Sequence, residues 1–153
     1  MKLSNRTKTI ALVLVSIIIL IILLSIAINL ISKSEEEQTA ISDNLVVKVI
    51  DGDTFQIASG ETIRLICVDT PETGTEGADE ATESLTSLIY NREVRLESDK
   101  DDKDAYGRLL RYVYVDYGGE EIFVNKEIVS QGYGTLFPHG NNTAKCEEIG
   151  SAN

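Results

Sequence analysis

Acidic residues and arginines recur at three places in the middle of this 153-residue chain. The first place is residues 49–54 (VIDGDT), the second is residues 64–72 (RLICVDTPE) and the third is residues 106–108 (YGR). Carboxylates are ligands for hard metal ions, and the planar guanidinium group of arginine binds two phosphate oxygens at once. If the three segments meet in the folded chain, their side chains suit the hydrolysis of a phosphate ester by an activated water.

Two carboxylates and a backbone carbonyl form the candidate metal site. Asp53, Asp69 and such a carbonyl offer only oxygen ligands, which favours Ca²⁺ or Mg²⁺. Glu72 is the candidate for orienting or deprotonating the water. Arg64 and Arg108 are the candidates for holding the phosphate and the negative charge that develops on it.

The chain lacks the residues that several other kinds of hydrolytic site require. His139 is the only histidine, which excludes sites that need two histidines, including most zinc sites. The chain contains no Gly-x-Ser-x-Gly elbow and no Gly-Lys-Ser/Thr phosphate loop. Chemistry by carboxylates and guanidinium groups therefore remains.

Each acidic residue also has a purely structural interpretation. Asp51 and Asp53 suit a tight turn, Asp69 suits a cap, and Glu72 suits a solvated surface position. Arg64 is harder to explain, because it lies among apolar neighbours in a predicted strand, where an arginine usually pairs. Strict alternation would put Arg64 and Asp69 on opposite faces, so a shared site requires the strand to bulge or end before Asp69.

The apolar pattern predicts a mainly β domain of the α+β class. Runs rich in β-branched residues and bounded by turn residues predict strands, and a helical apolar period predicts helices. Five strands with helices packed on them favour a small OB-type barrel. The predicted strands are 45–50, 54–58, 62–68, 93–97 and 109–115, the predicted helices are 78–90 and 124–131, and 98–104 is expected to be a mobile charged loop.

An uncharged apolar segment, residues 10–31, precedes this domain. As a helix it would match the hydrocarbon thickness of a bilayer, and it is longer than the apolar core of a cleaved signal peptide. Basic residues before it predict that residues 1–9 are cytoplasmic and that the domain lies outside the membrane. We expect a transmembrane signal anchor at 10–31, a linker at 32–43 and one domain at 44–153, with secretion after cleavage as the alternative.

The charge of the predicted domain limits how it attracts nucleic acid. Residues 44–153 hold ten Lys or Arg against twenty-one Asp or Glu, so the net charge of −11 resides there. Such a surface gains nothing from long-range attraction to a polyanion. Phosphate binding therefore requires a local site and a bound cation.

Cys67 and Cys146 are the only cysteines of the chain. Cys67 lies in an apolar run, where we favour the interpretation as a small buried side chain. A disulfide between the two cysteines is the alternative, less favoured because small secreted scaffolds usually carry more cysteines.

Together the three segments resemble the thermonuclease family, also called staphylococcal nuclease-like domains. The matching motifs are residues 49–54, residues 64–72, and residues 106–109 with Tyr112-Val113. Val124-Asn125 and Gln131-Gly132 resemble a later helix of the family. The resemblance implies an OB barrel with helices and Ca²⁺-dependent hydrolysis of DNA and RNA that releases 3′-phosphate ends.

The resemblance also implies a role for each matching site residue. It implies that Ca²⁺ binds to Asp53, Asp69 and the carbonyl of Thr70. It implies no obligate protein partner, so we expect a monomer. The other implied roles are catalytic for Arg64, Glu72 and Arg108, contact with the phosphate or sugar of the substrate for Tyr106, and support of the site for Asp51.

Several stretches depart from the family pattern. Loop 73–77 carries no basic residue, and Ala105 stands where a family member has a lysine near the phosphate. The segment 133–137 is short, so Tyr133 or Phe137 would have to replace its base-stacking tyrosines. The departures bear on affinity, and none of them removes a catalytic group.

Two other function classes compete with a membrane-anchored, extracytoplasmic nuclease. A non-catalytic OB-type module would bind single strands or a protein without cutting, but such a module has no need of the complete set of carboxylates and arginines. A purely structural domain would leave Arg64 and the spaced carboxylates as coincidence. We favour the nuclease.

Overall fold

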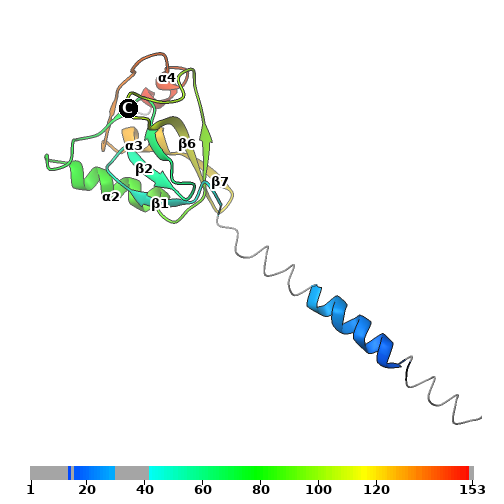
Figure 1. The fold of residues 1–153 in the computed structure, drawn as a ribbon. Helices are drawn as coiled ribbons and strands as arrows, with labels where there is room; N and C mark the ends of the chain where they lie inside the picture. Colours follow the sequence, from blue (N-terminus) through cyan, green and yellow to red (C-terminus); the bar gives the residue numbers. More distant parts are fainter. Residues whose placement is uncertain (1–13, 15, 30–41, 152–153) are drawn as a thin grey trace, which may run out of the picture. The chain divides into compact units, whose positions relative to one another are not determined.

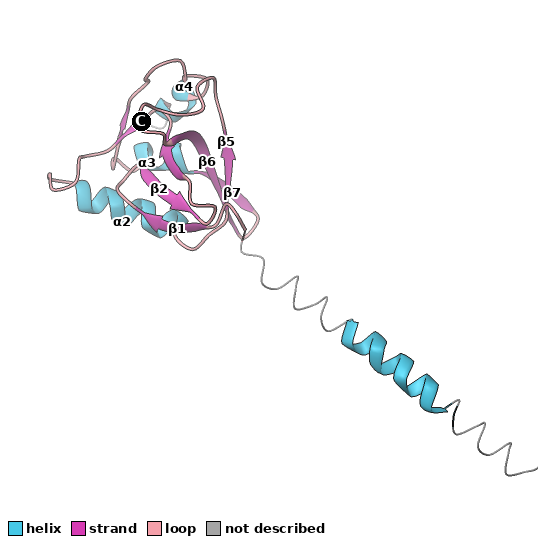
Figure 2. Cartoon of the chain, in the orientation of Figure 1, coloured by secondary structure: helices cyan, strands magenta, loops and turns pink. Residues whose placement is uncertain are grey.

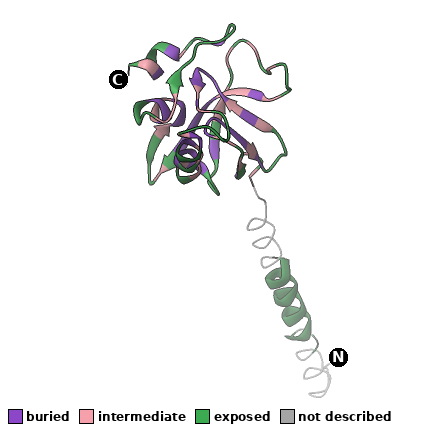
Figure 3. Cartoon of the chain, turned by 90° about the vertical axis from the view of Figure 1, so that its left-hand side faces the viewer, coloured by how far each residue is buried: buried purple, intermediate pink, exposed green. Residues whose placement is uncertain are grey.

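The computed structural model describes residue 14, residues 16–29 and residues 42–151. The chain separates into two compact units, Met1–Ala40 and Ile41–Asn153. In the first unit, residues 16–29 are helical and exposed throughout (Figure 3).

The predicted anchor lies only partly within the described residues. No helix among them is long and apolar enough to cross a bilayer. Residues 1–9, the ends of the predicted anchor at 10–13 and 30–31, and residues 32–41 of the predicted linker fall outside the described ranges.

The second unit is built on a six-stranded sheet with helices packed on it (Figures 1 and 2). The strand order is β1-β2-β3-β6-β5, with β7 paired to β6, and β4 and β8 form a separate two-stranded ladder. The strands are β1 (Val46–Val49), β2 (Thr54–Ile57), β3 (Thr62–Leu65), β4 (Val68–Asp69), β5 (Val94–Glu97), β6 (Leu109–Tyr117), β7 (Glu120–Phe123) and β8 (Thr135–Leu136). The helices are α2 (Ala78–Ile89), α3 (Val124–Ser130) and α4 (Cys146–Gly150).

Strand pairing matches the predicted meander and adds a crossover. β1, β2 and β3 pair antiparallel in chain order, and β3 then pairs parallel with β6. The sheet ends touch where Leu45 and Glu93 form an isolated antiparallel bridge and Val46 N–H donates to the Arg92 carbonyl at 2.9 Å. No continuous ladder joins β1 to β5 in the described residues, so the mainly β, α+β class is confirmed and the OB-type barrel stays a prediction.

The core forms where the sheet meets α2 and α3. The buried face of α2 presents Ala81, Leu85 and Ile89, the apolar positions that its helical period predicts. α2 runs beside β1, and α3 lies against β6 and contacts both α2 and α4 (Figure 1). Figure 3 shows buried residues concentrated in these strands and helices.

Candidate active site

The first acidic motif is the turn between β1 and β2. Asp51 N–H donates to the Thr54 carbonyl at 3.3 Å, and Asp53 N–H donates to Oδ1 of Asp51 at 3.1 Å. A Cβ at Gly52 would lie 2.8 Å from Oγ1 of Thr70, so only glycine allows the turn to pack this closely. The turn predicted from local chemistry is therefore present, and it points Asp53 inward, where it is 5% exposed.

The second motif depends on where β3 ends. β3 stops at Leu65, and Cys67 takes a left-handed φ of 61° before β4 begins. The reversal brings Nη2 of Arg64 to 3.3 Å from Oδ1 of Asp69. The condition that the strand must bulge or end before Asp69 is confirmed.

A buried amide on α3 fixes this strand end. Asn125 is fully buried, and its Nδ2 donates to the Ile66 carbonyl at 2.9 Å. Its Oδ1 accepts from Val113 N–H of β6 at 2.8 Å. The motif Val124-Asn125 is recognisable in the sequence, but the carbonyl that the Asn125 amide binds could not be predicted from it.

Arg64 bridges the two candidate metal carboxylates. Its Nη1 forms an ion pair with Oδ1 of Asp53 but lacks hydrogen-bond geometry there, and its Nη2 reaches Asp69. Asp53 also accepts hydrogen bonds from Oγ1 of Thr54 at 2.9 Å and from Thr70 N–H at 3.3 Å. Burial of Arg64 opposes its charge, but Asp53 and then Asp69 outweigh that effect and raise the pKa of Arg64.

Asp51 lies in the same turn as Asp53, and the negative charge of Asp53 acts on its carboxyl group. Burial raises the pKa of Asp51 above its usual value, and the neighbouring Asp53 carboxylate adds to the rise. Asp51 thus supports the Asp53 backbone at an electrostatic cost.

Arg108 is held by Asp104, which is not among the site residues predicted from the sequence. Oδ2 of Asp104 accepts from Nε of Arg108 at 2.6 Å, and Oδ1 accepts from the Tyr106 and Arg108 N–H groups at 2.9 and 3.0 Å. The charged run 98–104 hid this role. An Asp three residues before Gly107, whose φ is 82°, is a turn signal that would have revealed it.

These side chains meet in one small polar cleft of about 90 Å³. Glu72 lines it from an exposed position. Asp69 does not line the cleft, but its Oδ1 lies 3.3 Å from Nη2 of Arg64, which does. The structure therefore brings most of the predicted residues together around one small space, whereas Asp69 and Tyr106 lie beside it. The residues lining the cleft are Asp51, Asp53, Arg64, Thr70, Pro71, Glu72 and Arg108.

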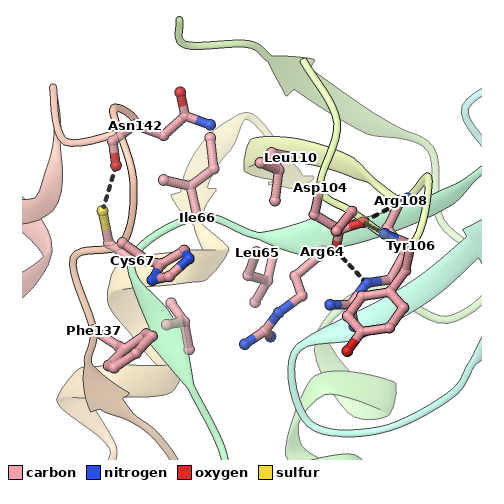
Figure 4. Close-up of a pocket in the computed structure, with 13 residues that line it drawn as sticks. Arg64, Leu65, Ile66, Cys67, Asp104, Tyr106, Arg108, Leu110, Phe137 and Asn142 are labelled. Carbon is pink, nitrogen blue, oxygen red and sulfur yellow. Dashed lines mark hydrogen bonds and ion pairs between the residues drawn. The ribbon is translucent and has the colours of Figure 1, made fainter. Parts of the chain in front are cut away.

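A wider pocket of about 270 Å³ adjoins the cleft and shares Arg64 and Arg108 with it (Figure 4). Tyr106, 86% exposed, lies at one side of Arg64 in Figure 4, and Phe137 lies at the other side. Of the two aromatic candidates for base stacking, Phe137 lines this pocket and Tyr133 does not.

A disulfide joins Cys67 to Cys146, so the less favoured of the two interpretations of these cysteines is the correct one. The bridge ties the turn after β3 to the first residue of α4. Both sulfur atoms also lie close to the carbonyl oxygen of Asn142, at 3.4 and 3.6 Å.

The donor set at the cleft fits a hard cation. Asp53 and Asp69 converge on one positive group, the guanidinium of Arg64, and the Thr70 backbone lies beside Asp53. The predicted ligand atoms, from the two carboxylates and the Thr70 carbonyl, are all oxygens. Among the described residues no cluster of three or more His, Cys, Asp or Glu side chains is placed to hold a metal, so a cation here would need backbone oxygens and water as further ligands.

The sequence is similar to those of known nucleases. Residues 62–153 match the family model described as staphylococcal nuclease homologue. The chain is 40% identical over 100 residues to the thermonuclease of Staphylococcus hyicus (57% of this chain, 54% of that protein) and 41% identical over 97 residues to the thermonuclease of Staphylococcus intermedius (58% and 55%). It is 39% identical over 79 residues to the endonuclease YncB of Bacillus subtilis (45% and 37%). The matches thus span about half the length of the thermonucleases.

Proposed function

The chain belongs to the staphylococcal nuclease homologue family, and on this premise we propose that it is a Ca²⁺-dependent nuclease that hydrolyses phosphodiester bonds of DNA and RNA. The observation that carries the proposal is the convergence of two arginines and several carboxylates in one cleft. A structural or purely binding role does not require Glu72 and Arg108 to face the same small space as Asp53.

The proposed cation site consists of Asp53, Asp69 and the carbonyl of Thr70. Hard oxygen donors suit both Ca²⁺ and Mg²⁺, and the similarity to thermonucleases favours Ca²⁺. When bound, the ion would neutralise the phosphate and lower the pKa of a water. Asp53 and Asp69, which pair with Arg64 in this structure, would hold the ion, and the guanidinium group of Arg64 would then be available to the substrate phosphate.

The chain's own side chains divide the remaining work. Glu72 takes a proton from the attacking water, and the new P–O bond forms as the bond from phosphorus to O5′ breaks. The departing O5′ takes up a proton from solvent, which leaves a 3′-phosphate and a 5′-hydroxyl end. Arg64 and Arg108 hold the phosphate oxygens as negative charge builds on them.

The adjoining pocket suits the nucleoside next to the cleaved phosphate. Tyr106 would contact the phosphate or sugar, and Phe137 offers an apolar face for a base. The domain would act as a monomer with an OB-type barrel, and the backbone contacts between residues 44–46 and 91–94 support that closure.

We further propose that residues 10–31 anchor the protein in the cell membrane with the domain on the outer side, with secretion after cleavage as the alternative. Two features support this placement. The segment is uncharged and apolar, with basic residues before it. The disulfide is of a kind that persists outside the reducing cytosol.

A cleavage assay tests the proposed function. The full-length chain, purified in detergent, is incubated with single-stranded DNA and with RNA, with Ca²⁺ or with an excess of chelator. We expect cleavage with Ca²⁺, 3′-phosphate product ends, and no cleavage with chelator. Failure to cut either polymer would refute the proposal, and equal binding of DNA in both conditions without cutting would favour a binding module.

A further inference from the structure

A C-terminal segment closes one wall of the wider pocket. Residues 137–146, which we name the strap, leave β8 and end at α4. Phe137 N–H donates to the Cys67 carbonyl at 3.0 Å at one end of the strap, and the disulfide from Cys146 to Cys67 fixes the other end. Both ends of the strap are therefore held at the turn that places Arg64 beside Asp69.

One strap side chain reaches across to a second loop. Asn142 is 3% exposed, its Oδ1 accepts from Asp101 N–H at 2.8 Å, and its Nδ2 donates to the Asp101 carbonyl at 2.8 Å. A single amide thus satisfies both backbone groups of Asp101. The neighbouring Asn141 is exposed, and its Nδ2 donates to Oδ2 of the Asp101 side chain at 3.0 Å.

The loop that Asn142 holds leads directly to Arg108. After Asp101 the chain returns to β6 through Leu110 N–H, which donates to the Asp102 carbonyl at 2.9 Å. Two residues further, Asp104 accepts from Nε of Arg108. The buried amide is therefore one fixed point at the start of a short loop that ends at Arg108, and the Lys103–Leu109 bridge and the Asp104 N–H bond to the Arg108 carbonyl anchor the loop further along.

We propose that Asn142 is a positioning residue: by clamping the Asp101 backbone it fixes the loop whose Asp104 orients Arg108 toward the cleft. The inference rests on the nuclease function proposed above. Asn142 has no polar contact with Arg108 itself, so its effect passes through the loop.

Kinetics of the full-length chain test the proposal through a double-mutant cycle. Asn142→Ala should lower kcat/KM for single-stranded DNA about tenfold, whereas the matched control Asn141→Ala should stay within about twofold of wild type. In an Arg108→Ala background, Asn142→Ala should add less than about twofold. If Asn142→Ala lowered kcat/KM by the same factor in the wild-type and Arg108→Ala backgrounds, the proposal would be overturned. A general loss of stability or of pocket shape acts independently of Arg108 and would give that result.

Hydrogen exchange provides a readout that does not require nuclease activity. The Tyr106 and Arg108 N–H groups donate to Asp104, so their exchange rates report the order of the loop. Asn142→Ala should speed their exchange about tenfold and leave the amides of α2 unchanged, and Asn141→Ala should change neither set. Unchanged exchange of the Arg108 N–H in Asn142→Ala would contradict the positioning role even if the chain cuts DNA. Faster exchange in that variant, with no DNA cleavage by the wild-type chain, would refute only the proposed function.

Discussion

The two arginines of the cleft use their nitrogens differently. Nε of Arg108 donates to Asp104, which leaves the two Nη atoms of Arg108 for a phosphate. The two Nη atoms of a guanidinium group form a fork that can bind two phosphate oxygens at once. Arg64 instead engages both Nη atoms with Asp53 and Asp69. At the residue scale, Arg108 is held by one nitrogen and presents its other two, whereas both terminal nitrogens of Arg64 face carboxylates.

Asp104→Ala tests the orientation of Arg108. Loss of the carboxylate frees the guanidinium group, so kcat/KM for single-stranded DNA should fall roughly 10- to 100-fold in a steady-state assay. The matched control is Asp102→Ala, which removes a more exposed carboxylate of the same loop that pairs with Arg111. Equal losses in the two variants would show that Asp104 has no special role.

Asp51→Asn tests the electrostatic cost of the turn. The folded-state pKa of Asp51 is raised, so its ionised form destabilises the folded chain at neutral pH, and this cost fades as pH falls through that pKa. Asparagine keeps an acceptor for Asp53 N–H. In urea unfolding without divalent cations, the variant should be more stable than wild type at pH 7 and about equal to it near pH 3, below the unfolded pKa of about 3.9.

An opposite result would contradict this reasoning about Asp51. A loss of stability at pH 7 would mean that the Asp51 carboxylate is stabilising. A gain of the same size at both pH values would mean that the effect does not come from ionisation.

At the element scale, local patterns predicted most strands and helices. α2 begins at Ala78 as predicted and ends at Ile89, one residue before the predicted end. β3 ends three residues earlier than predicted, because the turn is made by Ile66 and Cys67, which carry no turn signal. Such a turn is set by long-range contacts, the disulfide and the buried amide of Asn125, which no local pattern reveals.

The site residues, like the helices and strands, could be predicted only in part from the sequence. The candidates Asp53, Arg64 and Glu72 could be identified because their residue types and spacing fit one chemistry, and they do line one cleft. Asp104 was lost in a charged run, since composition does not distinguish a solvated aspartate from one that accepts three hydrogen bonds. The parallel pairing of β3 with β6, which brings Arg108 near Arg64, likewise follows only from the folded topology.

Reduction of the disulfide tests how strongly α4 and the strap depend on it. The bridge spans 79 residues and so restricts the unfolded chain, and its loss should lower the free energy of unfolding by roughly 2–5 kcal/mol. Urea unfolding with and without a reductant measures this difference. The double variant Cys67→Ala/Cys146→Ala is the control and should not respond to reductant; an equal response of wild type and control would contradict the prediction.

At the scale of the whole molecule, the domain is acidic, and its cleft holds two arginines among three carboxylates. Twenty-one acidic residues in 44–153 outnumber ten basic ones, and the basic residues of the cleft are Arg64 and Arg108. Attraction to nucleic acid must therefore be local, and few counterions are released when a strand binds.

The salt dependence of DNA binding tests this local character. With two arginines on phosphate, log K for single-stranded DNA should fall against log salt with a slope of about −1.4. Fluorescence anisotropy on the Glu72→Gln variant, which should bind without cutting, measures the slope at constant Ca²⁺. A slope of about −4 or steeper would reveal a basic surface that this structure does not have.

The central claim is that the cleft is a catalytic centre in which Glu72 activates water. Its most direct test is the Ca²⁺-supported cleavage rate of single-stranded DNA by Glu72→Gln, beside wild type and Glu76→Gln, an exposed neighbour in the same loop. We predict that Glu72→Gln lowers the rate by at least about 100-fold while DNA affinity stays within about twofold, and that Glu76→Gln cuts like wild type. Wild-type cleavage by Glu72→Gln would contradict the account.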